Sequence, residues 1–338
     1  MNILKDSSLQ ASKPVTIWLK SCLVLVLCMV AIGGLTRLTE SGLSIVEWKL
    51  VTGIFPPLSE AGWEAEFGEY QTSPEFVKKN SYMELSDFKR IFWLEYLHRL
   101  LGRLIGLVFL LPLIIFTLRR SAPPYWLKRF WCIFLLICLQ GGVGWYMVKS
   151  GLVHDPWVSP YRLAFHLSLA TIILGCIYLC IKGIRGNIHP PYRGKGVLLL
   201  ISIQIIWGAF VAGLDAGMIY NSFPLMGDRF MAEELFSTFP IWRSAFEHHA
   251  TVQFIHRWFA FIVLISIIWQ AITLRTTASF MVVGIALLQI TLGIATLLSV
   301  VNITLASIHQ LVAMGLVLAQ LYVIIQSPNG AKSGIITS

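Results

Sequence analysis

The stretch Leu94-Glu95-Tyr96-Leu97-His98-Arg99-Leu100-Leu101-Gly102-Arg103 places a carboxylate, an imidazole and two guanidinium groups at the start of a long apolar run. A second stretch, Val252-Gln253-Phe254-Ile255-His256-Arg257-Trp258, repeats part of this pattern. In both stretches a histidine followed by an arginine stands near the start of an apolar helix. The repetition predicts a duplicated cofactor site, whose other members must lie elsewhere in the chain.

The apolar runs around these stretches indicate a membrane protein. The chain has 338 residues, of which 56% are hydrophobic and only 13% charged, and its mean hydropathy is positive. A water-soluble domain would need a more polar surface. Because lipid offers no partner to backbone amides, each run of roughly 18 residues or more is predicted to be a spanning helix. Eight such runs lie at about 17 to 36, 98 to 118, 126 to 148, 160 to 181, 196 to 214, 254 to 274, 278 to 300 and 303 to 326.

Charge placement predicts the side of the membrane on which each connection lies. The connection from Arg37 to Glu95 carries ten acidic residues against six basic ones, whereas alternate connections and both termini are basic. This positive-inside pattern places both termini in the cytoplasm. It also explains the formal charge of +9 without nucleic acid as a partner. The basic residues concerned are Lys5, Lys13, Arg119, Arg120, Lys128, Arg129, Lys182, Arg185, Arg193, Lys195, Arg275 and Lys332.

The N-terminal segment is short and has neither a cleavage-site pattern nor the pattern of a transit peptide. We therefore expect a multi-pass protein of a bacterial cytoplasmic (inner) membrane. The long connection after the first span is predicted to contain a short helix from Ser59 through Phe67. It is interpreted as an interfacial helix, with a lid over a site as the alternative.

Short markers recur in the two halves of the chain, which predicts an internal repeat. Four helices separate equivalent elements, so the halves share one membrane orientation and are related by a pseudo-twofold axis along the membrane normal. The predicted fold is an all-α polytopic membrane protein whose eight transmembrane helices form two four-helix bundles, residues 1–188 and 189–338. The matched markers are Gly34-Leu35-Thr36 with Gly213-Leu214-Asp215, Phe55-Pro56-Pro57 with Phe223-Pro224-Leu225, Gln140 and Gly144 with Gln289 and Gly293, and His166 with His309.

Four intramembrane histidines, His98, His166, His256 and His309, are predicted to lie about six or seven residues inside helices that begin on the exterior side. This corresponds to a depth of roughly 10 Å. One such histidine would more often be a polar packing contact, but four at one level favour ligands. Imidazoles from facing helices bind haem iron axially, which pairs His98 with His166 and His256 with His309. Zinc would need further ligands, and the cysteines are scattered through the spans.

Arginines accompany these histidines. Arg99 and Arg257 directly follow a histidine, Arg103 lies one turn beyond Arg99, and Arg37 ends the first span. A guanidinium group matches a carboxylate in a bidentate manner, so all four are candidate contacts of haem propionates. The alternative for Arg99 and Arg257 is that they extend to the lipid headgroups.

Glu95 distinguishes the two halves. It precedes His98 by three positions and therefore shares a helical face with it, whereas the corresponding Gln253 is no base at neutral pH. The first half is predicted to carry proton-coupled chemistry and the second only to hold a haem. The alternatives are a carboxylate favoured by the helix dipole, or one that pairs with Arg99.

These residues resemble the haem A synthase family of alphaproteobacteria and mitochondria. The resemblance covers nearly the whole chain, through the segment from Gly33 to Ser44, the Glu95-x-x-His98-Arg99 segment, and the segment from Ala212 to Gly217. Members convert haem O to haem A for cytochrome oxidase, oxidising a ring methyl group through an alcohol and a hydrated aldehyde to a formyl group. Some members carry a cysteine pair in the first exterior loop, and this chain lacks it.

The resemblance implies roles for the candidate residues. His98 and His166 would face the substrate haem O, His256 and His309 would hold a haem b cofactor, and Glu95 would be the catalytic carboxylate. The expected partners are haem O, the haem O synthase, the lipid bilayer and an unidentified electron acceptor, since no quinone or flavin signature is present. Two alternatives stay open: a non-catalytic dihaem electron carrier with bis-histidine ligation, and a haem transporter or chaperone.

A stripe of small residues in the third span has two interpretations. Gly141, Gly142 and Gly144 either permit close helix packing within the bundle or form a face for a homo-oligomer.

Overall fold

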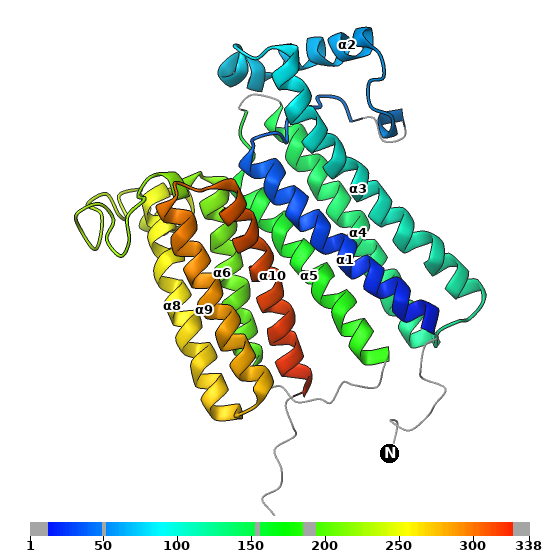
Figure 1. Cartoon of the computed structure of the whole chain (residues 1–338), viewed down its shortest axis with the longest axis vertical. Coiled ribbons are helices and arrows are strands. Elements are labelled where there is room, and N and C mark those ends of the chain that lie inside the picture. Colours follow the sequence, from blue (N-terminus) through cyan, green and yellow to red (C-terminus); the bar gives the residue numbers. More distant parts are fainter. Residues whose placement is uncertain (1–12, 49–51, 153–155, 185–193, 327–338) are drawn as a thin grey trace, which may run out of the picture.

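The computed structural model describes residues 13–48, 52–152, 156–184 and 194–326. Within these residues eight helices are long and apolar enough to cross a membrane, as the sequence predicts (Figure 1). Each satisfies its backbone hydrogen bonds internally, which lipid requires of a spanning segment. The helices are α1 (Lys13–Leu38), α3 (Leu85–Leu118), α4 (Pro124–Gly151), α5 (Pro160–Ile184), α6 (Lys195–Gly213), α8 (His249–Leu274), α9 (Thr277–Leu298) and α10 (Ile303–Gln326).

One helix departs from its predicted span. The apolar run of α3 starts at His98, but the helix itself begins at Leu85, where Glu84 and Asp87 form a capping box. The prediction that His98 lies six or seven residues inside its helix is therefore wrong. Hydropathy marks the membrane-embedded part of a helix, and α3 continues past it into a layer at one end of the apolar bundle.

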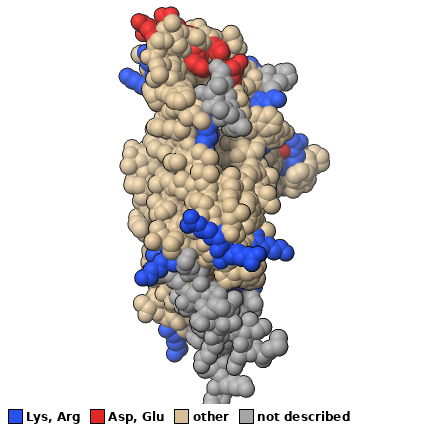
Figure 2. Space-filling view, turned by 90° about the vertical axis from the view of Figure 1, so that its right-hand side faces the viewer, with Lys and Arg blue, Asp and Glu red and all other residues tan. Residues whose placement is uncertain are grey.

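Aromatic packing explains this extension. Phe88, Phe92 and Tyr96 of α3 are buried in a cluster with Tyr70 of α2 (Glu60–Gln71). The predicted helix at Ser59 is thus present, and Ser59 caps it by accepting a hydrogen bond from the Gly62 amide at 3.2 Å. It lies against α3 at one end of the molecule (Figure 1). Acidic side chains gather at this end, and a band of basic ones crosses the opposite half (Figure 2).

The helices of each half pack in the same order. In the first half α1 and α4 each contact both α3 and α5, and in the second α6 and α9 each contact both α8 and α10. The halves meet where α5 packs against α6 and α1 against α10 (Figure 1). The pseudo-twofold axis stays a prediction, and the boundary at 188/189 and both termini lie outside the described residues.

A polar contact joins the halves inside the apolar bundle. Gln310 of α10 donates from Nε2 to the Val30 carbonyl oxygen of α1 at 3.0 Å. Gly34 makes room for it, because a Cβ atom at that position would overlap the Gln310 amide. The absence of a side chain at Gly34 therefore sets how closely α1 and α10 approach.

Candidate functional site

All eight spanning helices of the described chain line a cavity of about 1110 Å³. Ordinary small-molecule pockets measure roughly 300 to 1,000 Å³, so this one suits an unusually large ligand. Both halves contribute to its wall, and the predicted site residues all reach it. They are Arg37, Glu95, His98, Arg99, Arg103, His166, His256, Arg257 and His309.

Each of the four histidine rings lies against a glycine of a neighbouring helix. A Cβ atom on any of these glycines would come within 3.0 to 3.3 Å of the ring. Glycine therefore provides the space that the imidazole occupies. The pairs are His98 with Gly33 of α1, His166 with Gly144 of α4, His256 with Gly208 of α6, and His309 with Gly293 of α9.

This arrangement revises the interpretation of the small-residue stripe in α4. Gly144 is used by His166, whereas a Cβ atom at Gly141 or Gly142 would meet nothing within 4 Å. Close helix packing inside the protomer is therefore not what Gly141 and Gly142 provide.

We call each of these four glycine–histidine contacts a seat. In three of the seats, a glutamine lies four residues before the glycine. Gln204 Nε2 lies 3.1 Å from His256 Nδ1 and donates to the His256 carbonyl oxygen at 2.9 Å. Gln289 Nε2 lies 3.3 Å from His309 Nε2. Gln140 Nε2 donates to the His166 carbonyl oxygen at 3.1 Å. The fourth seat has Met29 in the corresponding place, so His98 differs from the other three histidines.

The members of each predicted histidine pair lie near each other, and their pairing as ligands stays a prediction. His98 and His166 are close enough for the charge of one to act on the other, and so are His256 and His309. Among the described residues, His166 Nδ1 is a buried nitrogen without a hydrogen-bond partner. Such an atom is costly in an apolar bundle unless a ligand accounts for it. Paired imidazoles around a large apolar cavity fit a planar macrocycle with a central iron.

Glu95 is the most completely bound acid in the cavity wall. Its Oε2 accepts hydrogen bonds from Ser44 Oγ at 2.7 Å and from the Ile45 amide at 2.9 Å. Its Oε1 accepts from Arg99 Nη2 at 2.6 Å, so the predicted alternative of an Arg99 pair is present. Only 2% of Glu95 is exposed. Three donors thus fix this carboxylate and stabilise its charge.

The second half meets its exterior loop differently. Gln253 Nε2 donates to the Tyr220 carbonyl oxygen at 3.1 Å, and Arg257 donates to the same atom. Arg257 also donates to the carbonyl oxygens of Ser222 and Leu225, at 2.9 and 3.3 Å. Here two donor side chains, Gln253 and Arg257, converge on backbone acceptors. The Glu95–Arg99 ion pair of the first half is thus replaced by an amide and an arginine that do not pair with each other but share an acceptor.

The arginines do not extend to the headgroups, so that alternative is wrong. The Arg99 side chain and Arg257 are each only 8% exposed. In the described part of the chain, Nε of Arg99 and Nε of Arg257 are buried donors without a partner. Each can therefore still donate to an anionic group inside the cavity.

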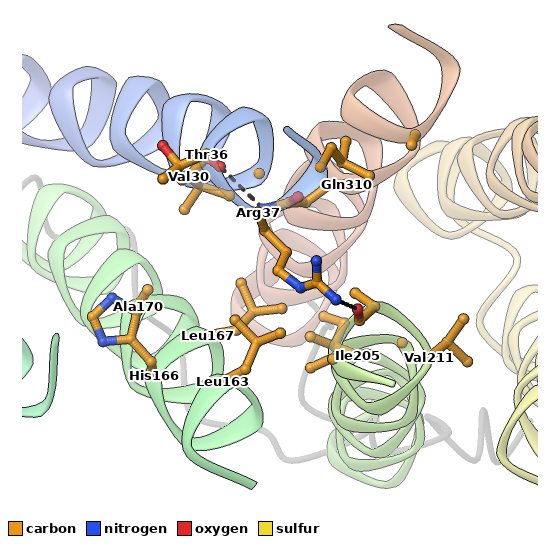
Figure 3. A pocket seen from close by; sticks show the side chains of 18 of the residues that line it. Val30, Thr36, Arg37, Leu163, His166, Leu167, Ala170, Ile205, Val211 and Gln310 are labelled. Carbon is orange, nitrogen blue, oxygen red and sulfur yellow. Dashed lines mark hydrogen bonds between the residues drawn. The ribbon is translucent and has the colours of Figure 1, made fainter. Parts of the chain in front are cut away.

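Arg37 connects the halves. It donates to the Ala212 carbonyl oxygen at 2.5 Å and pairs with Asp215 at 2.8 Å, just beyond the end of α6. Figure 3 shows Arg37 reaching across the cavity from α1, with Gln310 near it and His166 on the far side. The sequence identified Arg37 as a cavity residue but gave no sign of its partner in the other half.

Fold and site together define a polytopic membrane protein with an internal, histidine-lined cavity suited to haem. Comparison with known proteins is more specific. The model of the family described as cytochrome oxidase assembly protein, COX15-CtaA, matches residues 16–321. The chain belongs to this family, which confirms the resemblance that the sequence motifs indicate.

Relatives with curated names agree with the family match. The chain is 44% identical over 342 residues to the haem A synthase of Nitrosospira multiformis, covering 94% of each protein. It is 45% identical over 324 residues to the haem A synthase of Wolbachia pipientis wMel, covering 92% of each. The haem A synthase of Rhodospirillum centenum is 44% identical over 338 residues, with 94% of this chain and 90% of that protein covered.

Proposed function

We propose that this protein is a haem A synthase: an oxidoreductase that converts a ring methyl group of haem O into the formyl group of haem A, for cytochrome oxidase assembly. The single observation that carries the proposal is the asymmetry between Glu95 and Gln253. A buried carboxylate with fixed orientation lines the cavity in one half only. A carboxylate beside a substrate methyl group can act as a base in the oxidation, because it accepts protons that leave the carbon along with electrons.

The two histidine pairs take different roles in this proposal. His98 and His166 face haem O, and His256 and His309 are the ligands of a haem b cofactor. Haem b, when bound, supplies an iron that accepts and passes on single electrons. The contacts of Nδ1 support the cofactor assignment, since a hydrogen bond at one ring nitrogen fixes the orientation of a ring that ligates through the other. His256 Nδ1 lies 3.1 Å from Gln204 Nε2, and His309 Nδ1 lies 3.1 Å from the Gln289 carbonyl oxygen.

Four arginines serve the propionates of the two haems. Arg99 and Arg257 have buried Nε donors, and Arg37 and Arg103 line the same cavity. A guanidinium group has five N–H donors, so those bound to backbone oxygens still have hydrogen bonds to give.

The protein is placed in the bacterial inner membrane with both termini cytoplasmic, and its exterior layer faces the opposite side. The band of basic side chains in the opposite half of the molecule in Figure 2 supports this orientation. Residues 1–188 then form the substrate half and residues 189–338 the haem b half. The haem O synthase delivers the substrate, and an electron acceptor outside the chain completes the reaction.

The decisive experiment identifies the haems by mass after acid-solvent extraction of the purified protein. The wild type should contain haem A or its hydroxylated precursor together with haem b. In Glu95→Gln the amide keeps the shape of the side chain but accepts no proton. We expect haem A formation to fall by about 100-fold or more while haem b is retained.

Glu64→Gln is the matched control, because Glu64 is an exposed acid of the exterior helix α2. It should leave haem A formation unchanged. Haem b as the sole haem in wild type and Glu95→Gln alike would overturn the proposal and favour an electron carrier. Release of unmodified haem O to an acceptor protein would favour a transporter.

A further inference from the structure

A second acid lines the cavity from the exterior layer. Glu75 stands at the start of the π-helical turn η3 (Phe76–Asn80), and only 2% of it is exposed. It contributes to the same cavity wall as Glu95. The family resemblance implies no role for this residue, and within the described part of the chain its side chain has a hydrogen bond to Tyr70 and none to a histidine or an arginine. A carboxyl group buried in this position requires its own explanation.

The hydrogen bonds of Glu75 form a short directed chain. Asn80 Nδ2 donates to Tyr70 Oη at 2.7 Å, and Tyr70 Oη donates to Glu75 Oε2 at 3.1 Å. Glu75 therefore has a phenol hydroxyl where Glu95 has the Arg99 guanidinium group. A neutral donor stabilises a carboxylate far less than a cation does, so burial remains the largest influence on the pKa of Glu75.

Charged groups act on Glu75 from three parts of the chain, namely η3, α3 and the segment just after α1. Lys79 of η3 pairs with Glu40 at 3.2 Å and stands 3.4 Å above the Trp157 ring. Burial raises the pKa of Glu75 to about 7, and the charges of Glu95 and Glu40 raise it as well. The Tyr70 hydrogen bond and the Lys79 charge act in the opposite direction. Both protonation states of Glu75 are thus populated near neutral pH.

The three acids differ in exposure. Glu95 and Glu75 are each 2% exposed, whereas the Glu40 side chain is 48% exposed. All three line the cavity. The charges of Glu95 and Glu40 both act on Glu75, so Glu75 lies near the buried carboxylate and near an acid that reaches water.

We propose that Glu75 is the proton acceptor at the exterior end of the cavity, taking protons from Glu95 and releasing them to exterior water past Glu40. This rests on the proposed function, in which Glu95 receives protons as haem O is oxidised. In each transfer the O–H bond of the Glu95 carboxyl group breaks and an O–H bond forms on Glu75. No electron moves in this step, because the electrons leave through the haem and the external acceptor.

The pH dependence of haem A formation tests this role in the full-length protein. Glu75 accepts a proton only when ionised, so the wild-type rate should rise with pH through the Glu75 pKa of about 7. In Glu75→Gln this rise should disappear, and the rate above it should fall by about 10- to 100-fold with haem b retained. Glu64→Gln is the control and should keep both the rise and the rate. A Glu75→Gln profile equal to wild type would overturn the proposal.

Tyr70→Phe provides a second test that preserves the ring packing. Removing its hydroxyl deletes a hydrogen bond that lowers the Glu75 pKa, so the rise in rate should move to higher pH. This variant also answers the case in which Glu75→Gln fails to fold. An unmoved pH profile in folded Tyr70→Phe would contradict the proposed acceptor.

Infrared difference spectroscopy separates this proposal from the proposed function, because it needs no turnover. As the pH of the purified protein falls through about 7, a protonated carboxyl band should appear. The band should shift in heavy water, vanish in Glu75→Gln and persist in Glu95→Gln. If haem A is formed but the band is missing, the role of Glu75 fails alone. If the band titrates and no haem A is formed, the proposed function fails and takes the relay with it.

Discussion

At the scale of single residues, each of the four cavity histidines depends on a neighbouring residue that has no side chain. Each ring occupies space that a glycine leaves open, and a side chain there would compete with the ring for the same volume. Closely packed interiors respond to a single added methyl group. The site therefore requires glycine at these four positions as strictly as it requires histidine opposite them.

The two glycines of α9 allow a matched test. In Gly293→Val the new side chain meets the His309 ring, because a Cβ atom added at position 293 would lie 3.0 Å from His309 Cε1. Gly284→Val makes the same change in the same helix, where nothing lies within 4 Å. We expect Gly293→Val to lose most of its haem b absorbance and Gly284→Val to keep it. Equal haem b content in two folded variants would show that His309 does not depend on this seat.

The sequence indicates the histidines and Glu95, because ionisable groups in apolar runs are visible without a structure. It gives less warning of the glycines and glutamines around them. Within the spanning helices the Gln–x–x–x–Gly spacing is present three times, at 140, 204 and 289, but the match of Gly34 with Gly213 obscured the copy at Gln204. Glu75 was missed because it lies among exterior acids that resemble an ordinary solvated loop.

At the scale of elements, hydropathy predicts where a helix is embedded, and packing determines where it ends. The predicted spans agree with seven of the eight observed spanning helices to within about five residues. The exception is α3, whose first three turns are half apolar and buried against α2 instead of in lipid. Aromatic pairs such as Tyr70 with Phe88, whose centroids lie 5.2 Å apart, hold this exterior extension in place.

The contact between α1 and α10 gives a prediction for helix association. Gly34→Ala should displace the Gln310 side chain and break its hydrogen bond to the Val30 carbonyl oxygen. Loss of such a bond costs about 1 kcal/mol, so the protein should aggregate at a lower temperature. Gly106→Ala, where nothing lies within 4 Å, is the control.

A double variant checks the cause of that loss. Gln310→Ala added to Gly34→Ala should cost little more than Gly34→Ala alone, because both changes remove one interaction. Additive losses in thermal stability would mean that the two residues act separately.

At the scale of the whole molecule, one cavity joins two similar halves. Arg37 pairs across it with Asp215, Gln310 binds α1, and α5 packs along α6. The interface therefore combines apolar packing with polar contacts, which include the Arg37–Asp215 ion pair and the Gln310 hydrogen bond to Val30.

Cutting the connection between the halves tests this view. A protease site inserted between residues 188 and 189 of the full-length protein would be cleaved after purification in mild detergent. We expect both fragments to elute together with haem b still bound, because the interface and not the connecting segment holds them. Fragments that separate at once would show that the linker maintains the assembly, and Arg37→Ala should promote such separation.

The two exterior loops have a consequence for how such a repeat diverges. The segment at Ser44 and Ile45 turns a hydroxyl and an amide hydrogen toward α3, whereas the segment from Tyr220 to Leu225 turns carbonyl oxygens toward α8. An acid at position 253 would face the lone pairs of carbonyl oxygens, and an amide at position 95 would turn its own NH2 group toward hydrogen-bond donors. The polarity of the loop backbone thus acts as a template that selects acid or amide on the helix below, so copying Glu95 into the second half would not copy its chemistry.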